Sequence, residues 1–204
     1  MLIGGGGHCH SVLDSILALG TYKEIGIIDN VNSSVLGIDV IGCDDDIPAF
    51  FKAGWTEAFI TVGSIGSTKI RRRLYQMVKM IGLTVPSIKD PTAVIAKGTI
   101  IGEGAFIGKQ AVINTGSIIG ECSIINTGAI IEHDCVVNNF SHISSGTVLC
   151  GQVQIGEDTH IGAGSVVRQQ ISIGNNVLIG AGSVVVKNIP NNVKGYGNPC
   201  KVVR

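Results

Sequence analysis

Aliphatic side chains recur at every sixth position from residue 95 to residue 185, without a gap. A small residue stands four positions after most of them. This hexapeptide period is typical of a parallel β-helix, in which three six-residue strands complete one triangular coil and the aliphatic side chain points into the prism. Because coils stack at ~4.8 Å, the pattern predicts about five coils, and its unbroken register predicts no long loop leaving the prism. The aliphatic positions are Ile95, Ile101, Ile107, Ile113, Ile119, Ile125, Ile131, Val137, Ile143, Leu149, Ile155, Ile161, Val167, Ile173, Ile179 and Val185.

The first third of the chain has a different pattern, in which short apolar runs alternate with helical spacing. This alternation predicts a small parallel α/β sheet. Two prolines near Pro86 and Pro91 break regular structure, so we expect a first domain over residues 1–86 and a β-helix with a short C-terminal tail over residues 87–204. The predicted elements are strands at Met1–Ile3, Ile25–Ile28 and Glu57–Val62 and helices at Ser11–Leu19 and Thr68–Ile81, the last with Arg71, Arg72 and Arg73 opposite its apolar side.

Composition narrows the function classes. Lys+Arg and Asp+Glu both number 15, so no basic surface indicates nucleic acid or an anionic membrane as a partner. The sequence lacks a leader pattern and an apolar run of about 18 residues, which favours a cytoplasmic protein that does not cross a membrane. Six scattered cysteines without a C-x-x-C pair are expected to be reduced, mostly structural thiols.

The run Gly4–His8 follows a predicted strand and precedes a helix, a place where backbone amides hold anions. It is an incomplete G-x-G-x-x-G, because Cys9 stands where the last glycine belongs. Asp29 ends the second strand about where a ribose contact is expected. We therefore favour nucleotide binding over a merely structural tight turn. A metal site at His8 and His10 is disfavoured, because no partner lies at ligand spacing.

The stretch Asn126–His142 holds three consecutive polar residues, Glu132, His133 and Asp134, where the repeat otherwise prefers small turn residues. One coil is eighteen residues, so Gly151 is expected to stack directly on His133. A histidine over a bare glycine has open space and a backbone amide beside it. Acyl transfer needs a base near neutral pH and a donor for the developing oxyanion, which this pair can supply. The carboxylate of either Asp134 or Glu132 could orient the ring, which favours this interpretation over that of a solvated turn histidine.

His142 and His160 are also eighteen residues apart, and each precedes an inward isoleucine, so both side chains are predicted to face outward. Two stacked histidines could bind a metal, as in a γ-carbonic-anhydrase-like β-helix. A role in lining a cleft or an interface is favoured instead, and of these two we favour the interface.

Four motifs together resemble the hexapeptide-repeat acyltransferases, and among them the bacterial enzymes that N-acetylate a UDP-4-amino-sugar and the sialic acid O-acetyltransferases. The resemblance implies a Rossmann-like N-terminal subdomain, a left-handed parallel β-helix and transfer of acetyl from acetyl-coenzyme A to an amino or hydroxyl group of a sugar in surface glycan biosynthesis. No metal is expected. The motifs are the entry at Gly6, Gly7 and His8, the run Asn126–Asp134, Phe140–His142 and the closing Gly195–Arg204.

The same resemblance implies residue roles. His133 is the expected general base and Asp134 its polarising partner. Gly151, Ala163 and Ala181 are expected to stack eighteen residues apart, or nearly so, beside the pantetheine arm, with His142 at the acetyl end. The acceptor, a UDP-sugar or a sialic acid, is assigned to Gly7, His8, Asp29, Asn30, Gly63, Asn126 and Glu132.

A homotrimer is the expected assembly. His133 and His142 are nine residues apart, half a coil, so they point from opposite sides of one prism and can serve one reaction only across a subunit boundary. The rival interpretation of the whole chain is a β-helix scaffold that binds sugar without catalysis. A scaffold has no need for the polar cluster around His133.

Overall fold

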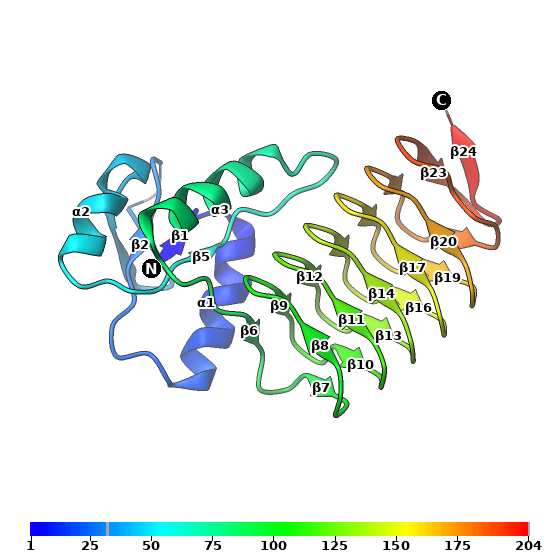
Figure 1. The fold of residues 1–204 in the computed structure, drawn as a ribbon, viewed down its shortest axis with the longest axis horizontal. Coiled ribbons are helices and arrows are strands. Elements are labelled where there is room, and N and C mark those ends of the chain that lie inside the picture. Colours follow the sequence, from blue (N-terminus) through cyan, green and yellow to red (C-terminus); the bar gives the residue numbers. More distant parts are fainter. Residues whose placement is uncertain (32, 204) are drawn as a thin grey trace.

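The computed structural model describes residues 1–31 and 33–203, which form an α/β domain beside a long triangular prism (Figure 1). The α/β domain contains one sheet with strand order β3-β4-β2-β1-β5. Its central strands are parallel, as predicted, and only β3 is antiparallel. The strands are β1 (Leu2–Ile3), β2 (Ile27–Ile28), β3 (Ser34–Val35), β4 (Ile38–Gly42) and β5 (Phe59–Ile60), and the helices are α1 (Gly7–Leu19), η1 (Asp44–Asp46), α2 (Ile47–Lys52) and α3 (Lys69–Ile81).

The α1 helix begins at Gly7, four residues before the predicted start, and ends at Gly20, whose φ of 63° matches the left-handed cap typical of helix ends. The α3 helix matches its predicted range, but its arginines do not form one solvent-facing side. Arg71 is buried and Ile70 is exposed, because α3 packs with this side against the prism. The pair β3 and β4 and the short α2 were not predicted.

Three sheets, parallel except for β24 at the end of the third, form the sides of the prism, and we name them faces A, B and C. Face A contains β7 (Val94–Ile95), β10 (Val112–Ile113), β13 (Ile130–Ile131), β16 (Val148–Leu149), β19 (Val166–Val167) and β22 (Val184–Val185). Face B contains β8 (Ile100–Ile101), β11 (Ile118–Ile119), β14 (Val136–Val137), β17 (Gln154–Ile155) and β20 (Ser172–Ile173). Face C contains β6 (Ile88–Lys89), β9 (Phe106–Ile107), β12 (Ile124–Ile125), β15 (His142–Ile143), β18 (His160–Ile161), β21 (Leu178–Ile179), β23 (Lys194–Tyr196) and β24 (Lys201–Val203).

The register confirms the hexapeptide prediction. From β7 to β22, each strand pairs with the strand eighteen residues away on the same face, as Ile113 does with Ile131, and its second residue points into the prism. The buried corner residues Ser117 and Ser141 are satisfied, since Ser117 Oγ donates to the carbonyl of Glu132 at 2.9 Å and Ser141 Oγ to that of Gly156 at 2.6 Å. The prism core is therefore aliphatic, and its corners are held by hydroxyl bonds.

The α/β domain covers face C. The outward residues Phe106 and Ile124 join Leu2 and Leu13 in one apolar cluster. At the corner between faces B and C, Arg72 binds both carboxylate oxygens of Asp158, at 2.8 and 2.9 Å. The corner between faces A and B, which we call the A/B corner, lies on the side of the prism away from this domain.

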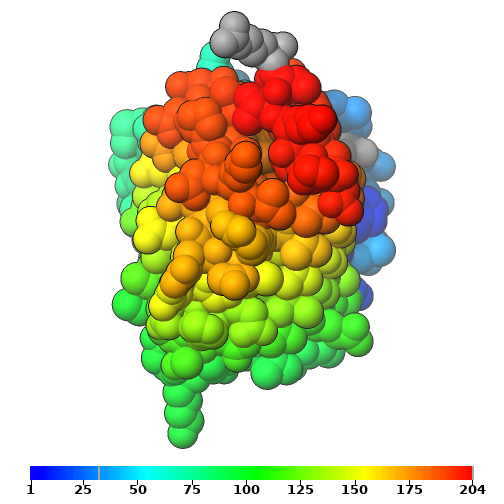
Figure 2. Space-filling view, turned by 90° about the vertical axis from the view of Figure 1, so that its right-hand side faces the viewer, coloured from blue at the N-terminus to red at the C-terminus, as the bar shows by residue number. Residues whose placement is uncertain are grey.

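The C-terminal residues lie across the far end of the prism, where β23 pairs with β21 and β24 turns back antiparallel to β23 (Figures 1 and 2). Arg204, the last residue of the closing motif, is outside the described residues. Within residues 1–31 and 33–203, no helix has the length and apolar character needed to span a bilayer.

Candidate active site

His133 lies on the A/B corner, in the turn between β13 and β14, with its side chain 54% exposed. The imidazole covers Gly151: a Cβ added to that glycine would lie only 2.5 Å from His133 Nε2. The stacking expected from the eighteen-residue coil is therefore present. Gly151 is buried beneath the ring, and among the described residues its amide donates to no protein group.

Asp134 fixes which ring nitrogen of His133 can act as a base. His133 Nδ1 lies 2.9 Å from Asp134 Oδ2, and because a carboxylate only accepts, Nδ1 carries the hydrogen and Nε2 keeps its lone pair in the neutral ring. Asp134 has a left-handed φ of 59°, and its carboxylate occupies the space above Gly116, where a Cβ would lie 2.3 Å from Oδ1. A bare glycine thus makes room for each member of the pair.

Glu132, the third polar residue of this turn, faces another partner. Its Oε2 accepts a hydrogen bond from Asn114 Nδ2 at 3.0 Å, one coil away. The structure therefore makes Asp134, and not Glu132, the carboxylate that orients His133.

Asn126 and His142 lie together on the opposite side of the prism, at the seam with the α/β domain. Asn126 Nδ2 is 3.3 Å from His142 Nε2, and His142 Nδ1 is 3.2 Å from the carbonyl oxygen of Ser64. His142 also packs edge-on against His160, with ring centroids 4.8 Å apart. As predicted, both histidines point outward from the prism, and His142 meets this chain's own N-terminal domain.

The predicted stack of Gly151, Ala163 and Ala181 is wrong in one respect. Ala163 and Ala181 stack, since a Cβ on Gly162 would meet the amide of Ala181 at 2.4 Å. Gly151 is only twelve residues from Ala163, two thirds of a coil, and lies on the A/B corner, whereas the two alanines lie on the corner between faces C and A, the C/A corner. Within one chain, Gly151 and the two alanines therefore form two separate surfaces on different corners, which we call the two walls.

The residues assigned to the nucleotide lie at one end of the N-terminal sheet, where β1, β2 and β5 have their carboxyl ends. Asp29 Oδ2 accepts from the Gly5 amide at 2.6 Å and Oδ1 from the Val31 amide at 2.8 Å, so this carboxylate organises the glycine loop. Gly63 follows β5 and packs near His8, and Asn30 is exposed beside Asp29. A Cβ on Gly7 would meet nothing within 4 Å, so the loop is open there.

His8 lies beside Gly63, but its ring is directed at the prism. Its ring packs edge-on against Phe106 at 5.3 Å, and its Nε2 is buried without a hydrogen-bond partner in the described structure. Burial, aided by the charges of Arg71 and His142, lowers the pKa of His8 to about 3. The ring thus lies in the seam between the domains as a neutral group.

A cleft between α1 and the C/A corner holds residues that the sequence did not indicate. Lys109 Nζ binds Asp14 at 2.7 Å and the buried Asp90 at 3.3 Å. Burial would raise the pKa of Asp90, but hydrogen bonds from Ser15, Thr92 and Lys109 outweigh it and lower the pKa to about 2. These partners come from distant segments, so no local motif marks them. The cleft is lined by His10, Ser11, Asp14, Ser15, Leu36, Phe106, Lys109 and Thr127.

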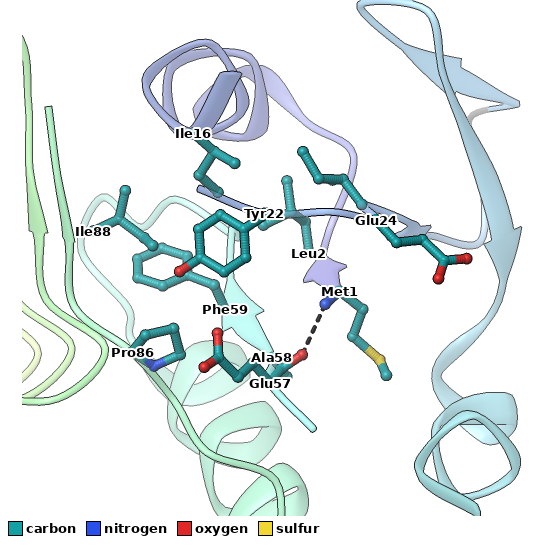
Figure 3. Close-up of a pocket in the computed structure, with 11 residues that line it drawn as sticks. Met1, Leu2, Ile16, Tyr22, Glu24, Glu57, Ala58, Phe59, Pro86 and Ile88 are labelled. Atoms are coloured by element: carbon teal, nitrogen blue, oxygen red, sulfur yellow. Dashed lines mark hydrogen bonds between the residues drawn. The ribbon is translucent and has the colours of Figure 1, made fainter. Parts of the chain in front are cut away.

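Another pocket lies at the opposite end of the N-terminal sheet, near the amino ends of the strands, beside Met1, Tyr22 and Glu57 (Figure 3). The terminal amine of Met1 donates to the Glu57 carbonyl at 2.7 Å, and burial lowers its pKa to about 6. Ligands of open α/β sheets bind at the carboxyl ends of strands, so this pocket is on the wrong side for the predicted nucleotide. No group of three or more potential metal ligands occurs in the part of the chain that the structure describes.

Family models match both parts of the chain. Residues 1–78 match the PglD N-terminal domain. Residues 98–133 match the hexapeptide repeat of succinyl-transferase, and residues 152–187 match the bacterial transferase hexapeptide (six repeats). No curated protein sequence matches the chain.

Solved structures match the chain over its whole length. The acetyltransferase domain of PglB from Neisseria gonorrhoeae is 36% identical, the match covers 99% of this chain and 98% of that one, and the TM-score is 0.94. PerB from Caulobacter crescentus, solved with CoA and GDP-perosamine, is 33% identical over 100% of this chain and 96% of that one, with a TM-score of 0.94. WeeI from Acinetobacter baumannii, 22% identical, shares the fold with a TM-score of 0.89. The chain therefore belongs to the hexapeptide-repeat family of β-helix transferases, in the group of sugar acetyltransferases that carry a PglD-type N-terminal domain.

Proposed function

We propose that this protein transfers the acetyl group of acetyl-coenzyme A to the amino group of a nucleotide-linked amino sugar. The observation that carries the proposal is the imidazole of His133, which Asp134 orients and which lies over Gly151. Among the described residues, the Gly151 amide donates to no protein group. This arrangement offers a base and an oxyanion donor within one coil spacing of each other. The related PerB was solved with CoA and GDP-perosamine, and the PglB domain with acetyl coenzyme A.

In the proposed reaction, the sugar amine attacks the thioester carbonyl. His133 Nε2 takes the proton from the amine as the C–N bond forms, and the Gly151 amide donates to the carbonyl oxygen as it becomes an oxyanion. The C–S bond then breaks, and the coenzyme A thiolate leaves and regains a proton. Asp134 stabilises the imidazolium that exists between these two proton transfers.

The N-terminal domain is proposed to hold the nucleotide part of the acceptor. Its glycine loop after β1 is open at Gly7, stands at the start of a thirteen-residue helix and is braced by Asp29. A helix start of this kind suits a diphosphate. From there the cleft beside His10 and Lys109 leads to the C/A corner, where Asn126 lies next to Thr127. The sugar ring is assigned to this cleft.

A homotrimer completes the proposed site, and face A supplies the surface for it. The outward residue of every strand on this face is aliphatic, and Val94 and Val166 are 62% and 37% exposed. Such an apolar stripe is typical of a protein contact surface. The stripe consists of Val94, Val112, Ile130, Val148, Val166 and Val184.

A threefold axis in front of face A would place the A/B corner of one chain beside the C/A corner of the next. His133 and Gly151 of one subunit would then face Asn126, Ala163 and Ala181 of its neighbour. The two separate walls of one chain become the two sides of a single groove, which is proposed to hold the pantetheine arm.

The test is a thiol-release assay with acetyl-coenzyme A and a panel of acceptors. UDP- and GDP-linked amino sugars, their hydroxyl analogues and free sialic acid separate N-acetylation from O-acetylation, and nuclear magnetic resonance of the product identifies the acetylated atom. We expect release only with nucleotide-linked amino sugars. Release with sialic acid alone would support the O-acetyltransferase alternative, and absence of release with every acceptor would support a sugar-binding scaffold.

A further inference from the structure

A chain of hydrogen bonds crosses the seam between the two domains. It begins at the carbonyl of Ser64, in the loop between β5 and α3, and reaches His142 Nδ1 over 3.2 Å. His142 Nε2 is then 3.3 Å from Asn126 Nδ2. At the far end, Asn126 Oδ1 accepts from the backbone amide of Thr127 at 2.8 Å. The chain thus joins the loop that follows Gly63 to the C/A corner of the prism.

The direction of every bond in this chain follows from its two ends. A carbonyl oxygen only accepts, so His142 Nδ1 must carry the hydrogen toward Ser64. The Thr127 amide only donates, which identifies the oxygen of the Asn126 amide and leaves its nitrogen as the donor toward His142. His142 Nε2 must therefore accept. Both ends require the same neutral tautomer, with hydrogen on Nδ1 alone.

The surroundings keep His142 neutral. Burial lowers the pKa of His142 to about 4, and the neighbouring His160 and the buried Arg71 guanidinium contribute. Arg71 Nη1 also lies 3.2 Å from Ser64 Oγ, so this cation is attached to the same loop. No carboxylate in the described structure bonds to the His142 ring. A second hydrogen on Nε2 would meet the hydrogens of the Asn126 amide.

We propose that His142 is a positioning residue: held by the Ser64 carbonyl in its Nδ1-H tautomer, it accepts from Asn126 and so orients the Asn126 amide toward the acceptor sugar. The inference rests on the proposed function for the identity of that acceptor. Asn126 Oδ1 accepts from the Thr127 amide and, at 3.4 Å, from the Thr127 hydroxyl, and one N–H of Asn126 points to His142. The amide therefore keeps its second N–H for the ligand. His142 itself neither donates to the acetyl group nor moves a proton.

These hydrogen bonds from Ser64 through His142 to Asn126, which we call the relay, also link the two halves of the acceptor site. Ser64 is next to Gly63, at the carboxyl ends of the strands where the nucleotide is assigned. Asn126 is at the C/A corner, where the cleft assigned to the sugar ring ends. A nucleotide that fixes this loop also fixes the Asn126 amide, so the nucleotide part of the acceptor is expected to improve turnover as well as binding.

The tautomer can be measured without any assay of activity. Long-range ¹H–¹⁵N spectra of ¹⁵N-histidine-labelled protein distinguish a protonated ring nitrogen from one with a lone pair, and the spectrum of His142→Gln identifies the signal. We expect hydrogen on Nδ1 and none on Nε2, unchanged from pH 8 to pH 5. A hydrogen on Nε2, or titration near pH 6.5, would overturn the proposal whatever the substrate proves to be.

Variants of His142 test its positioning role in the thiol-release assay. His160 is the matched control, because it is the neighbouring histidine one coil away but bonds to neither Ser64 nor Asn126. We expect His142→Leu to lower kcat/KM for the acceptor by about tenfold, the scale of one misoriented hydrogen bond, with the KM for acetyl-coenzyme A unchanged. His142→Gln, which keeps an acceptor for the Asn126 amide, should recover most of the loss, and His160→Leu should remain near wild type.

Three results would contradict the relay: a raised KM for acetyl-coenzyme A in His142→Leu, an equal loss in His160→Leu, or no recovery in a folded His142→Gln. Failure of the wild-type protein to acetylate any sugar would instead overturn the proposed function and leave the spectroscopic test standing. Circular dichroism melting of each variant separates unfolding from misorientation.

Discussion

His133 and His142 are nine residues apart on the same β-helix, and their surroundings make them chemically different. His133 is exposed on the A/B corner, faces a carboxylate at 2.9 Å and keeps Nε2 free. His142 lies in the seam under the N-terminal domain, with a carbonyl on one nitrogen, an amide on the other and a buried arginine nearby. An exposed imidazole with an anionic partner can gain and lose a proton during turnover, whereas an enclosed one with neutral partners serves as a fixed dipole.

The sharpest test of this contrast is His133→Ala. Removing a general base is expected to lower kcat by about 10²- to 10⁴-fold, while the melting temperature stays nearly constant because the side chain is exposed. Gln169→Ala, at the same corner position two coils further on, is the matched control and should retain activity. A loss below tenfold in steady-state thiol release would remove His133 from the role of base.

The seam histidines are expected to dominate the pH dependence of stability. The pKa values of His8 and His142 are about 3 and about 4 in the folded protein, against an ordinary value of 6.5. Both folded values are depressed, so below pH 6.5 the unfolded chain binds protons that the folded chain does not. The two groups together should remove about 3 to 4 kcal/mol of unfolding free energy between pH 7 and pH 5.

Urea denaturation at the two pH values measures this loss. In His142→Gln the loss should be smaller by about half of this 3 to 4 kcal/mol, because one of the two groups that supply it is gone. Burial also lowers the pKa of His160, whose contribution is common to both proteins. His133→Gln, which changes the exposed histidine, should show the full wild-type loss. Equal losses in wild type and His142→Gln would mean that His142 is protonated in the folded state.

Gly151→Ala probes the exposed histidine without touching it. The added methyl would lie 2.5 Å from Nε2, so the imidazole must tilt away from the Gly151 amide. A misplacement of this size is expected to lower kcat by about 10- to 100-fold. The measurement is steady-state kinetics, together with a crystal structure of the variant. An unmoved ring with full activity would show that the base does not need this contact.

The sequence predicted the geometry around His133 because, in a β-helix, residues that are one coil apart in the sequence are in contact in the structure. Eighteen residues make one coil, so the pairing of His133 with Gly151 required no knowledge of the other domain. From the residues alone, the carboxylate beside His133 was either Asp134 or Glu132. The family resemblance favoured Asp134, and in the structure it is Asp134 that lies 2.9 Å from His133 Nδ1. The same arithmetic placed Gly151 on a different corner from Ala163, a consequence that the family resemblance obscured.

The seam could not be predicted in the same way, because it depends on how the two domains pack. The bond from Asn126 to His142 spans sixteen residues, but the bond to Ser64 spans seventy-eight. Arg71 stands in a run of three arginines that has the pattern of a solvated helix side, yet packing against the prism buries it. The pair β3 and β4 was missed because β3 has only two residues and no alternating pattern.

Mixing variants of the two regions tests whether one active site is built from two subunits. If His133 of one subunit works with Asn126 of its neighbour, inactive His133→Ala chains mixed with inactive Asn126→Ala chains form some intact sites. In a random one-to-one mixture, each site takes an intact His133 with a chance of one half and an intact Asn126 with a chance of one half. About a quarter of wild-type activity should therefore return after subunit exchange. Val148→Asp chains, with a charge in the centre of face A, are the control and should be unable to exchange or to restore activity. No recovery between folded, exchanging chains, or full activity from a monomer in light scattering during turnover, would place the whole site within one subunit.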